Sequence, residues 1–287
     1  MATSKSVLAV GLIVVLIVTF AAGLYSAPYI FPKAPEPKQK TTWELVKEKG
    51  KIVVGCSPDY PPYEFLDPQT SNFTGFEIGL TELVAKRLNL TVEWKSMGFD
   101  LIIPDIQTNK IDLGVAGFSV TAKRLKVVQF TLPHTVSDRR YIMLKTRAAE
   151  LGITEVNTLE DLAKYNIKFG VQIGTTGETE IQALVTAGNI SASNVKTYED
   201  ALLIYEDLKR GVVDAQGGEG AFISTLMLEA EKKGDAPLVV VFRKPNYPMA
   251  FVANMESTEL VTQINSVLAE LIKEGAVKEL KIKWKIE

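Results

Sequence analysis

Beyond residue 41, short apolar runs rich in β-branched residues alternate with stretches in which apolar residues recur every three or four positions. The short runs have the length of buried strands, and the longer pattern is typical of amphipathic helices. This alternation predicts an α/β fold with largely parallel sheets. We expect strands at Lys51–Gly55, Thr91–Lys95, Ile111–Ala116, Tyr141–Lys145, Ile167–Val171, Val212–Ala215, Leu238–Phe242 and Met249–Ala253.

The expected helices have recognisable faces and ends. In the first, apolar residues at positions 80, 83, 84 and 88 share one face. The segment Tyr198–Arg210 stops before Gly211, and another helix runs from about residue 220 to 234. A last helix begins at Ser257 and ends near Gly275, because glycine commonly follows a helix C-terminus. A short terminal turn that holds Trp284 follows it.

The N-terminus carries an uncharged apolar run from Val7 to Leu24, preceded by Lys5. It is close to the roughly 17 to 25 residues of a membrane-spanning helix and longer than the roughly 7 to 15 of a signal-peptide core. Residues 1–26 are therefore expected to be a membrane anchor or a signal segment, cleaved among the small residues 22–27. Residues 27–42 are Pro-rich and predict an extended linker. Either outcome places the rest of the chain at the cell surface or in the periplasm.

Composition narrows the classes of function. Lys and Arg number 32 against 34 Asp and Glu, so no global charge favours a nucleic acid as partner. The single cysteine, Cys56, excludes an intramolecular disulfide, and the single histidine, His134, excludes His-rich metal sites. We expect no metal and no cofactor, and most hydrolase mechanisms become improbable.

A glycine-rich turn, Gly170–Gly177, lies between an expected strand and an expected helix. It lacks both the GxGxxG spacing of dinucleotide sites and the Lys-Ser/Thr ending of a P-loop. Its backbone N–H groups and two hydroxyls suit a carboxylate at a helix N-terminus. The alternative is that Thr175 or Thr176 merely caps that helix.

Several ordered segments together resemble the extracytoplasmic solute-binding proteins for polar amino acids, which serve ATP-driven uptake systems (bacterial extracellular solute-binding protein family 3). The resemblance spans residues 43–285 and includes an amphipathic C-terminal helix. It is carried by Gly50–Phe65 (GKIVVGCSPDYPPYEF), Gly75–Leu80 (GFEIGL), Phe99–Gln107 (FDLIIPDIQ), Lys110–Arg124 (KIDLGVAGFSVTAKR), Gly170–Thr176 (GVQIGTT) and Gly211–Ala215 (GVVDA).

This resemblance implies a type II periplasmic-binding-protein-like fold, in which two α/β lobes close over a ligand like a hinge. Lobe 1 would comprise residues 43–135 and 247–287, and lobe 2 residues 139–242. The chain would cross between the lobes near His134–Asp138 and Arg243–Tyr247. The ligand would be an amino acid, and the partner an ABC transporter permease that recognises the closed receptor. His134, near a crossing, is expected to pack or hydrogen-bond and not to catalyse.

The same resemblance assigns ligand contacts at the polar end of an amino acid. Arg124 would hold the α-carboxylate, for which a guanidinium is suited by its planar fork of donors. Ser119 and Thr176 would add hydrogen bonds, together with the backbone of Gly117 and of the turn around Thr175. The α-ammonium would meet Glu219.

Glu219 departs from the family pattern, which has an aspartate at this position. Glutamate keeps the charge and adds a methylene, so the site would be wider there or the ligand displaced. Glu219 could instead be an acid at the start of a helix, where the dipole favours it.

Other positions match the part of the family's site that holds the ligand side chain. Tyr60 and Phe99 would form two aromatic walls, although aromatic residues are more often core. Gln172 would read the end of the side chain, and Ser57 stands where binders of cationic amino acids tend to have Asp. We therefore expect a neutral polar or small side chain, with Asp59 or Glu64 as possible substitutes for the missing acid. Otherwise Asp59, Glu64 and Asp67 are expected to be solvated or local turn acids.

Two other functions stay open. Relatives of this fold include dehydratases that act on cyclohexadienyl acids such as prephenate and arogenate, and Glu219 in a closed, dry cleft could serve as their general acid. A ligand-sensing ectodomain is the third class, and it would need a signalling partner because the sequence has no second membrane segment and no kinase.

Overall fold

The structure is a computed structural model that describes residues 40–286, apart from the side chains of residues 245–247. Residues Thr41–Glu287 form a compact unit. The predicted anchor or signal segment and nearly all of the predicted linker lie outside the described residues. Within residues 40–286, no helix is long and apolar enough to cross a membrane.

The first sheet has the strand order β5-β1-β6-β13-β7. Strand β1 (Lys51–Cys56) pairs in parallel with β5 (Thr91–Ser96) and β6 (Leu113–Val115). Strand β13 (Val252–Ala253) returns late in the chain and pairs antiparallel with β6 and with β7 (Gln129–Phe130). The predicted strands at 51–55, 91–95 and 111–116 are confirmed, each to within two residues at its ends.

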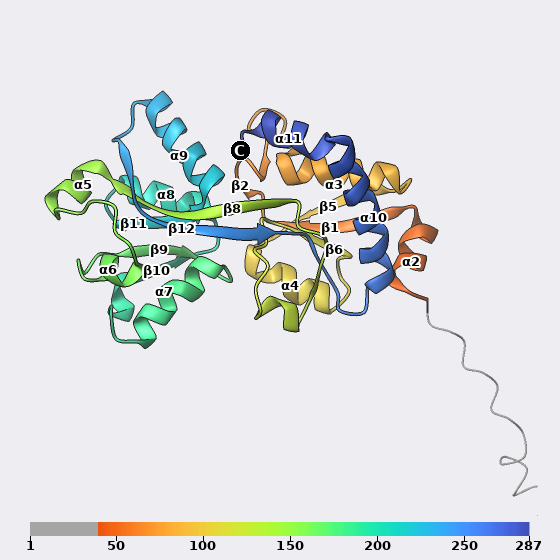
Figure 1. Cartoon of the computed structure of the whole chain (residues 1–287), viewed down its shortest axis with the longest axis horizontal. Helices are drawn as coiled ribbons and strands as arrows, with labels where there is room; N and C mark the ends of the chain where they lie inside the picture. Colours follow the sequence, from red (N-terminus) through yellow and green to blue (C-terminus); the bar gives the residue numbers. More distant parts are fainter. Residues whose placement is uncertain (1–39, 287) are drawn as a thin grey trace, which may run out of the picture. The chain divides into compact units, whose positions relative to one another are not determined.

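Helices cover both faces of this sheet. Figure 1 shows α3 (Phe76–Arg87) and α11 (Ala276–Trp284) above it and α4 (Phe99–Gln107) below. One apolar core joins the sheet to α3, to α10 (Thr258–Glu274) and to α2 (Thr42–Lys49), and a second joins it to α4. The expected terminal turn around Trp284 is in fact helix α11, because residues 276–284 contribute Val277 to the buried core.

The second sheet has the order β10-β9-β11-β8-β12. Its inner strands are β9 (Phe169–Gln172), β11 (Ala215–Glu219) and β8 (Thr135–Leu144), with β10 (Val195–Tyr198) at one edge. Helices α8 (Ala201–Lys209) and α9 (Gly220–Lys233) cover one face, and α6 (Leu159–Ala163) and α7 (Thr176–Thr186) cover the other. A short helix, α5 (Lys145–Glu150), follows β8.

Strands β8 and β12 (Leu238–Met249) form a long antiparallel ribbon that runs from the second sheet towards the first (Figure 1). The pairing extends from Leu144 opposite Leu238 to Thr135 opposite Met249, with two irregularities in the β12 strand. Strand β8 begins six residues before the strand start predicted at Tyr141. The additional residues are polar and have partners in the fold, since Arg139 pairs with Glu219 and Arg140 with Asp138. The boundaries of the two lobes stay a prediction, and we use lobe 1 and lobe 2 for the parts built on the first and second sheet.

Other expected strands need correction, and the one placed at Val212–Ala215 is β11, which begins only at residue 215. The predicted strand Met249–Ala253 is divided, since residue 249 ends β12 and only residues 252–253 form β13. A small sheet of β2 (Asp59–Tyr60), β3 (Glu64–Leu66) and β4 (Phe73–Thr74) was not expected, because two- and three-residue strands leave no periodic pattern.

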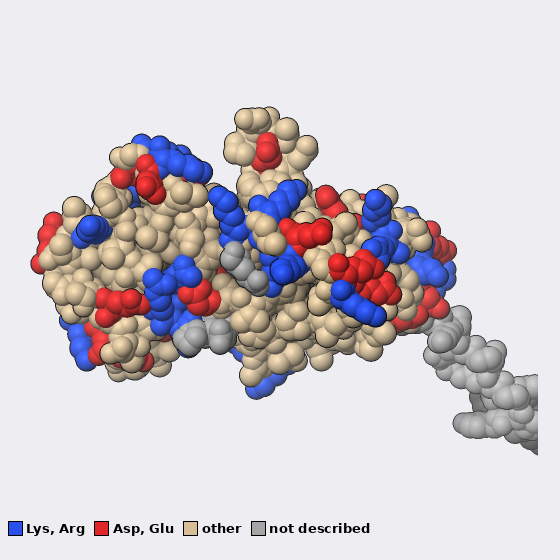
Figure 2. Space-filling model, turned by 45° about the horizontal axis from the view of Figure 1, so that its top comes forward, with Lys and Arg blue, Asp and Glu red and all other residues tan. Residues whose placement is uncertain are grey.

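The charged surface agrees with the near balance of the composition. On the face shown in Figure 2, basic and acidic side chains are interspersed, and no continuous basic surface forms. Local charge inside the molecule therefore matters more than the field of the whole.

Candidate functional site

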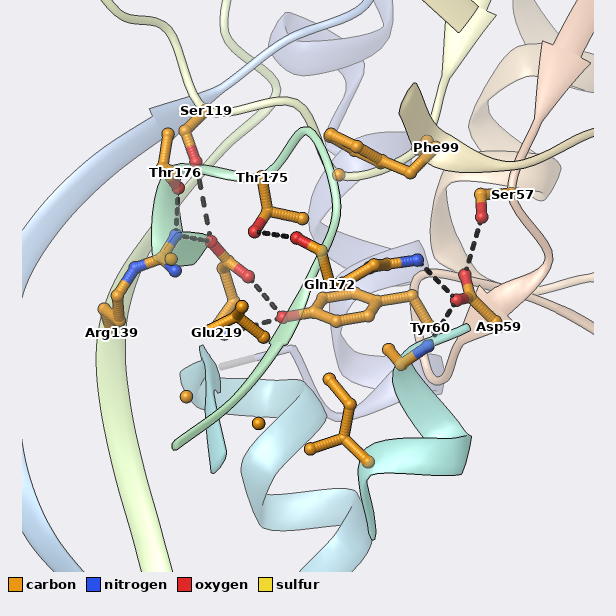
Figure 3. A pocket seen from close by; sticks show the side chains of 18 of the residues that line it. Ser57, Asp59, Tyr60, Phe99, Ser119, Arg139, Gln172, Thr175, Thr176 and Glu219 are labelled. Carbon is orange, nitrogen blue, oxygen red and sulfur yellow. Dashed lines mark hydrogen bonds and ion pairs between the residues drawn. The ribbon is translucent and has the colours of Figure 1, made fainter. Parts of the chain in front are cut away.

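A pocket lies between the two lobes, and all ten residues predicted for the site line it (Figure 3). From lobe 1 these are Ser57, Tyr60, Phe99, Gly117, Ser119 and Arg124; from lobe 2, Gln172, Thr175, Thr176 and Glu219. The free space in the pocket is small, about 40 Å³. Hydrogen bonds cross between the lobes around it, so the structure is a closed arrangement.

The fold brings these residues together at strand ends. Residues 57–60 follow β1, residues 116–119 follow β6, and residues 173–176 connect β9 to α7. Glu219 is the last residue of β11 and directly precedes α9. Because parallel strands end at one edge of a sheet, each lobe presents the carboxyl ends of its strands to the pocket, which is where open α/β sheets bind ligands.

Arg124 is a buried cation that forms no ion pair with any residue of the described part of the chain. Its Nη1 donates to the Ser119 carbonyl at 3.0 Å, and its Nη2 donates across the pocket to the Gly174 carbonyl at 3.2 Å. The guanidinium also lies over the rings of Phe99 and Phe118. Burial lowers its pKa to about 10, so it stays protonated at neutral pH. Within residues 40–286 no ion pair joins it to a carboxylate, and such a group suits an anion that enters the pocket.

Glu219 is buried and already has three hydrogen-bonding neighbours. Its Oε1 lies 2.7 Å from Nη2 of Arg139 and 3.4 Å from the Ser119 hydroxyl, and its Oε2 accepts a hydrogen bond from Tyr60. The Tyr60 oxygen in turn accepts from the Glu219 backbone N–H at 2.9 Å. The alternative placed Glu219 as an acid at the start of a helix, and Glu219 is indeed the N-cap residue of α9, although its carboxylate makes no capping hydrogen bond.

Arg139 is the main residue that the sequence did not identify. It lies on β8, is only 3% exposed, and donates to both Glu219 and the Thr176 hydroxyl. Burial, the largest single effect, lowers its pKa, but Glu219 together with Tyr141, Glu180 and Tyr60 outweighs burial and raises the pKa above the ordinary value. Arg139 directly follows the predicted crossing His134–Asp138, and this position gave no signal of a site, because charged residues are ordinary in exposed connections.

Asp59 is not solvated, contrary to expectation. It is 6% exposed and accepts three hydrogen bonds: from the Ser57 hydroxyl at 2.9 Å, from Gln172 Nε2 at 2.7 Å and from the Ala201 N–H at 2.7 Å. Two of these donors belong to lobe 2, so Asp59 connects the lobes. Burial raises its pKa to about 6 despite these hydrogen bonds.

Glu64 is also buried, not solvated. It lines the pocket and is 1% exposed, and burial together with the charge of Glu77 raises its pKa. Glu77 accepts from the Gly117 N–H at 3.0 Å and lies 3.2 Å from His134 Nε2. His134 packs against the rings of Phe76 and Phe251, in agreement with a packing role. Glu64 and Glu77 follow proline- and glycine-rich segments, so no periodic pattern in the sequence indicated that they are buried.

Asp67 behaves as expected of a turn acid. Its carboxylate accepts from the N–H groups of Gln69 and Thr70, and these bonds lower its pKa.

The aromatic and hydroxyl residues that line the pocket also have partners in the fold. Tyr60 stacks on Phe222 with ring centres 3.9 Å apart, and Phe99 stacks on Phe118 at 4.7 Å. Each of the two rings in the pocket is therefore backed by a second ring. Thr175 does cap α7, accepting from the Glu178 N–H, and its hydroxyl also donates to the Gln172 carbonyl.

Comparison with known proteins agrees with this geometry. The family described as "Bacterial extracellular solute-binding proteins, family 3" matches residues 52–287. The L-cystine-binding protein TcyJ of Escherichia coli is 27% identical over 241 residues, covering 83% of this chain and 84% of that protein. The arginine-binding extracellular protein ArtP of Bacillus subtilis is 24% identical over 82% of this chain and 86% of its own.

Solved structures show the same fold. An ancestral arginine-binding protein bound to arginine superposes with a TM-score of 0.72 at 30% identity, covering 82% of this chain and 98% of its own. The ancestral amino acid-binding protein AncCDT-1, a precursor of cyclohexadienyl dehydratase, has a TM-score of 0.72 at 28% identity and covers 85% and 99%. A two-lobed fold of the periplasmic-binding-protein type is thereby confirmed.

Proposed function

Because this chain belongs to the bacterial extracellular solute-binding proteins of family 3, we propose that it captures an amino acid, or a closely related α-substituted carboxylic acid, between its lobes. We propose further that it acts outside the cytoplasmic membrane, held by residues 1–26 or released from them, and delivers its ligand to the permease of an ABC transporter. It would do so as a receptor and not as an enzyme.

The observation that carries the proposal is Arg124. A protonated guanidinium, 7% exposed and without a carboxylate partner in the described part of the chain, faces a pocket shared by both lobes. Leaving a charge buried and unpaired is costly, and a ligand carboxylate would remove that cost. Such a ligand binds the closed state best, so its differential affinity would drive closure.

The remaining lining residues would orient the ligand. Ser119 and Thr176 lie close together at the Glu219 end of the pocket (Figure 3), and Tyr60 and Phe99 present ring surfaces for the side chain. At the far end, Ser57 and Gln172 already bond to Asp59, so the acid is engaged by donors of the protein. This supports a neutral side chain over a cationic one.

A thermal-shift screen of the full chain against the twenty amino acids tests the proposal. A ligand at about 100 times its Kd stabilises by about 2.7 kcal/mol, which is easily seen in Tm. Isothermal titration then compares the parent with Arg124→Gln, for which we expect at least a hundredfold loss of affinity, since hydrogen bonds to charged groups contribute about 1.5–3 kcal/mol each.

Arg140→Gln is the matched control, because Arg140 pairs with Asp138 outside the pocket. Equal affinity of Arg124→Gln and Arg140→Gln would contradict the proposal. Turnover of prephenate or arogenate by the parent would replace it with the dehydratase alternative, for which the likeness to AncCDT-1 is the supporting observation.

A further inference from the structure

The ion pair between Arg139 and Glu219 changes what this end of the pocket can recognise. The carboxylate and the guanidinium approach to 2.7 Å, with side chains 7% and 4% exposed. Figure 3 shows Thr176, Arg139, Glu219 and Ser119 grouped at the same end of the pocket. A cation supplied by the protein thus already sits at the carboxylate to which the resemblance assigns the ligand's ammonium.

We propose that Arg139 determines specificity by taking the place of an α-ammonium, so that the preferred solute is a 2-hydroxy or 2-oxo carboxylate and not the 2-amino acid with the same side chain. This inference rests on the proposed function, because it assumes that Arg124 holds a ligand carboxylate in this pocket. It names the chemical group that the ligand carries next to that carboxylate.

The first argument is the balance of charge beside Glu219. Two guanidiniums, those of Arg124 and Arg139, and one carboxylate face this end of the pocket. An ammonium at Glu219 would share a carboxylate that Arg139 already neutralises, and it would lie close to the Arg139 cation in a region shielded from water. Like charges repel strongly there because screening by water is weak.

A neutral oxygen meets no such penalty. A 2-hydroxyl group can donate to Glu219, which accepts through either oxygen, and a 2-oxo group can accept from the Ser119 hydroxyl or from a guanidinium. Both groups keep the carboxylate that Arg124 requires. The ion pair would then stay intact when the ligand binds.

The second argument is that no other acid in the pocket is available for an ammonium. Asp59 accepts three hydrogen bonds from Ser57, Gln172 and Ala201 and lies at the end where the ligand side chain would reach. Glu64 is buried beside Glu77, and burial with that neighbouring charge favours its neutral form.

Glu180 faces Arg139 from α7 and must be included in the balance. Its carboxylate lies 3.8 Å from Nε of Arg139 and 3.5 Å from Nζ of Lys244, so a second cation shares it. It approaches Nε, whereas Glu219 is bound through Nη2. Glu180 therefore helps to hold Arg139 in place and does not offer its charge to the pocket.

The test compares acids that share a side chain and differ only at C2. Isothermal titration of the full chain would use L-phenylalanine, L-phenyllactate and phenylpyruvate; L-leucine with its 2-hydroxy and 2-oxo counterparts; and L-alanine, L-lactate and pyruvate. In the best-binding set, we expect the hydroxy or oxo acid to bind at least tenfold more tightly than the amino acid. Arg139→Gln should reverse this preference, because it frees Glu219 for an ammonium.

Two further variants separate the role of charge from that of structure. Arg139→Lys keeps the cation and should keep the preference, whereas Arg139→Gln combined with Glu219→Gln removes both charges and should abolish the reversal. If no member of any set, and no amino acid of the wider screen, binds the parent, the proposed function fails. Tighter binding of the amino acid than of its hydroxy and oxo counterparts by the parent overturns this inference alone and leaves the receptor function standing, whether or not the variants fold.

Discussion

Replacing Asp59 by asparagine should change how stability depends on pH. The introduced amide can keep the network, with its oxygen accepting from Gln172 and Ala201 and its NH₂ group donating to the Ser57 hydroxyl. The substitution therefore removes a titrating group from a buried site between the lobes with little change in packing.

The magnitude follows from the pKa of Asp59. Burial raises this pKa from an ordinary value of 3.8 to about 6, and each pH unit corresponds to about 1.4 kcal/mol, so the full effect is about 3 kcal/mol. An acid whose pKa is raised on folding binds its proton more tightly in the native state, so it stabilises the fold at low pH. That stabilisation is lost as pH rises through about 6. About 2 kcal/mol of the loss occurs between pH 4.5 and pH 8.

Urea unfolding of the parent and of Asp59→Asn at pH 4.5, 6 and 8 measures the effect. We expect the stability of the variant, relative to the parent, to be about 2 kcal/mol higher at pH 8 than at pH 4.5. Asp67→Asn is the matched control, because backbone hydrogen bonds in an exposed turn lower the pKa of Asp67 from its ordinary value of 3.8. Its contribution to stability changes only below this pH range, so the relative stability of Asp67→Asn should stay nearly constant from pH 4.5 to 8. A relative stability of Asp59→Asn that stays constant from pH 4.5 to 8 would refute the reasoning.

Further predictions concern packing and closure. Gly75→Ala should lower the free energy of unfolding, measured by thermal unfolding, by more than about 3 kcal/mol, because Gly75 has φ +130° and a Cβ would lie 2.3 Å from the Tyr63 carbonyl oxygen. The control Gly50→Ala should cost only about 1–2 kcal/mol, because Gly50 has φ +64° and open space around it. Equal losses would contradict this. Phe222→Ala should destabilise the fold by about 3–5 kcal/mol and weaken ligand binding, since the ring is fully buried and stacks on Tyr60. Unchanged affinity would show that Phe222 does not support Tyr60 in ligand binding. Small-angle scattering should show a smaller radius with the best ligand, while circular dichroism stays constant, and an unchanged radius at saturation would count against hinge closure.

The sequence was most informative where a physical period or a dense motif existed. Strands such as Lys51–Cys56 and helices such as Thr258–Glu274 have apolar residues at the spacing of their buried faces, and both were predicted nearly to their ends. The ten site residues came from a resemblance that spans most of the chain, and the pocket contains all of them. Their roles in binding stay predictions.

The charged interior could not be predicted for an identifiable reason. Arg139 and Asp59 are buried only because partners from distant parts of the chain, Glu219 and Gln172, satisfy them. No local pattern distinguishes such a residue from a solvated one, since burial of a charge depends on its partners and not on its neighbours in sequence. The same cause concealed the first half of β8, whose polar residues look like an exposed connection until their partners are known.

The late return of β13 into the first sheet affects how the chain can be synthesised. Strand β13 inserts between β6 and β7, which precede the whole second sheet in the chain. The strands of lobe 2, residues 135–249, are therefore all made while the first sheet still has two unpaired inner edges. Such edges are templates for pairing with other chains. The incomplete first lobe of the nascent chain is thus prone to aggregation. Any factor that protects the chain during export has to act until residues 252–253 have emerged from the ribosome.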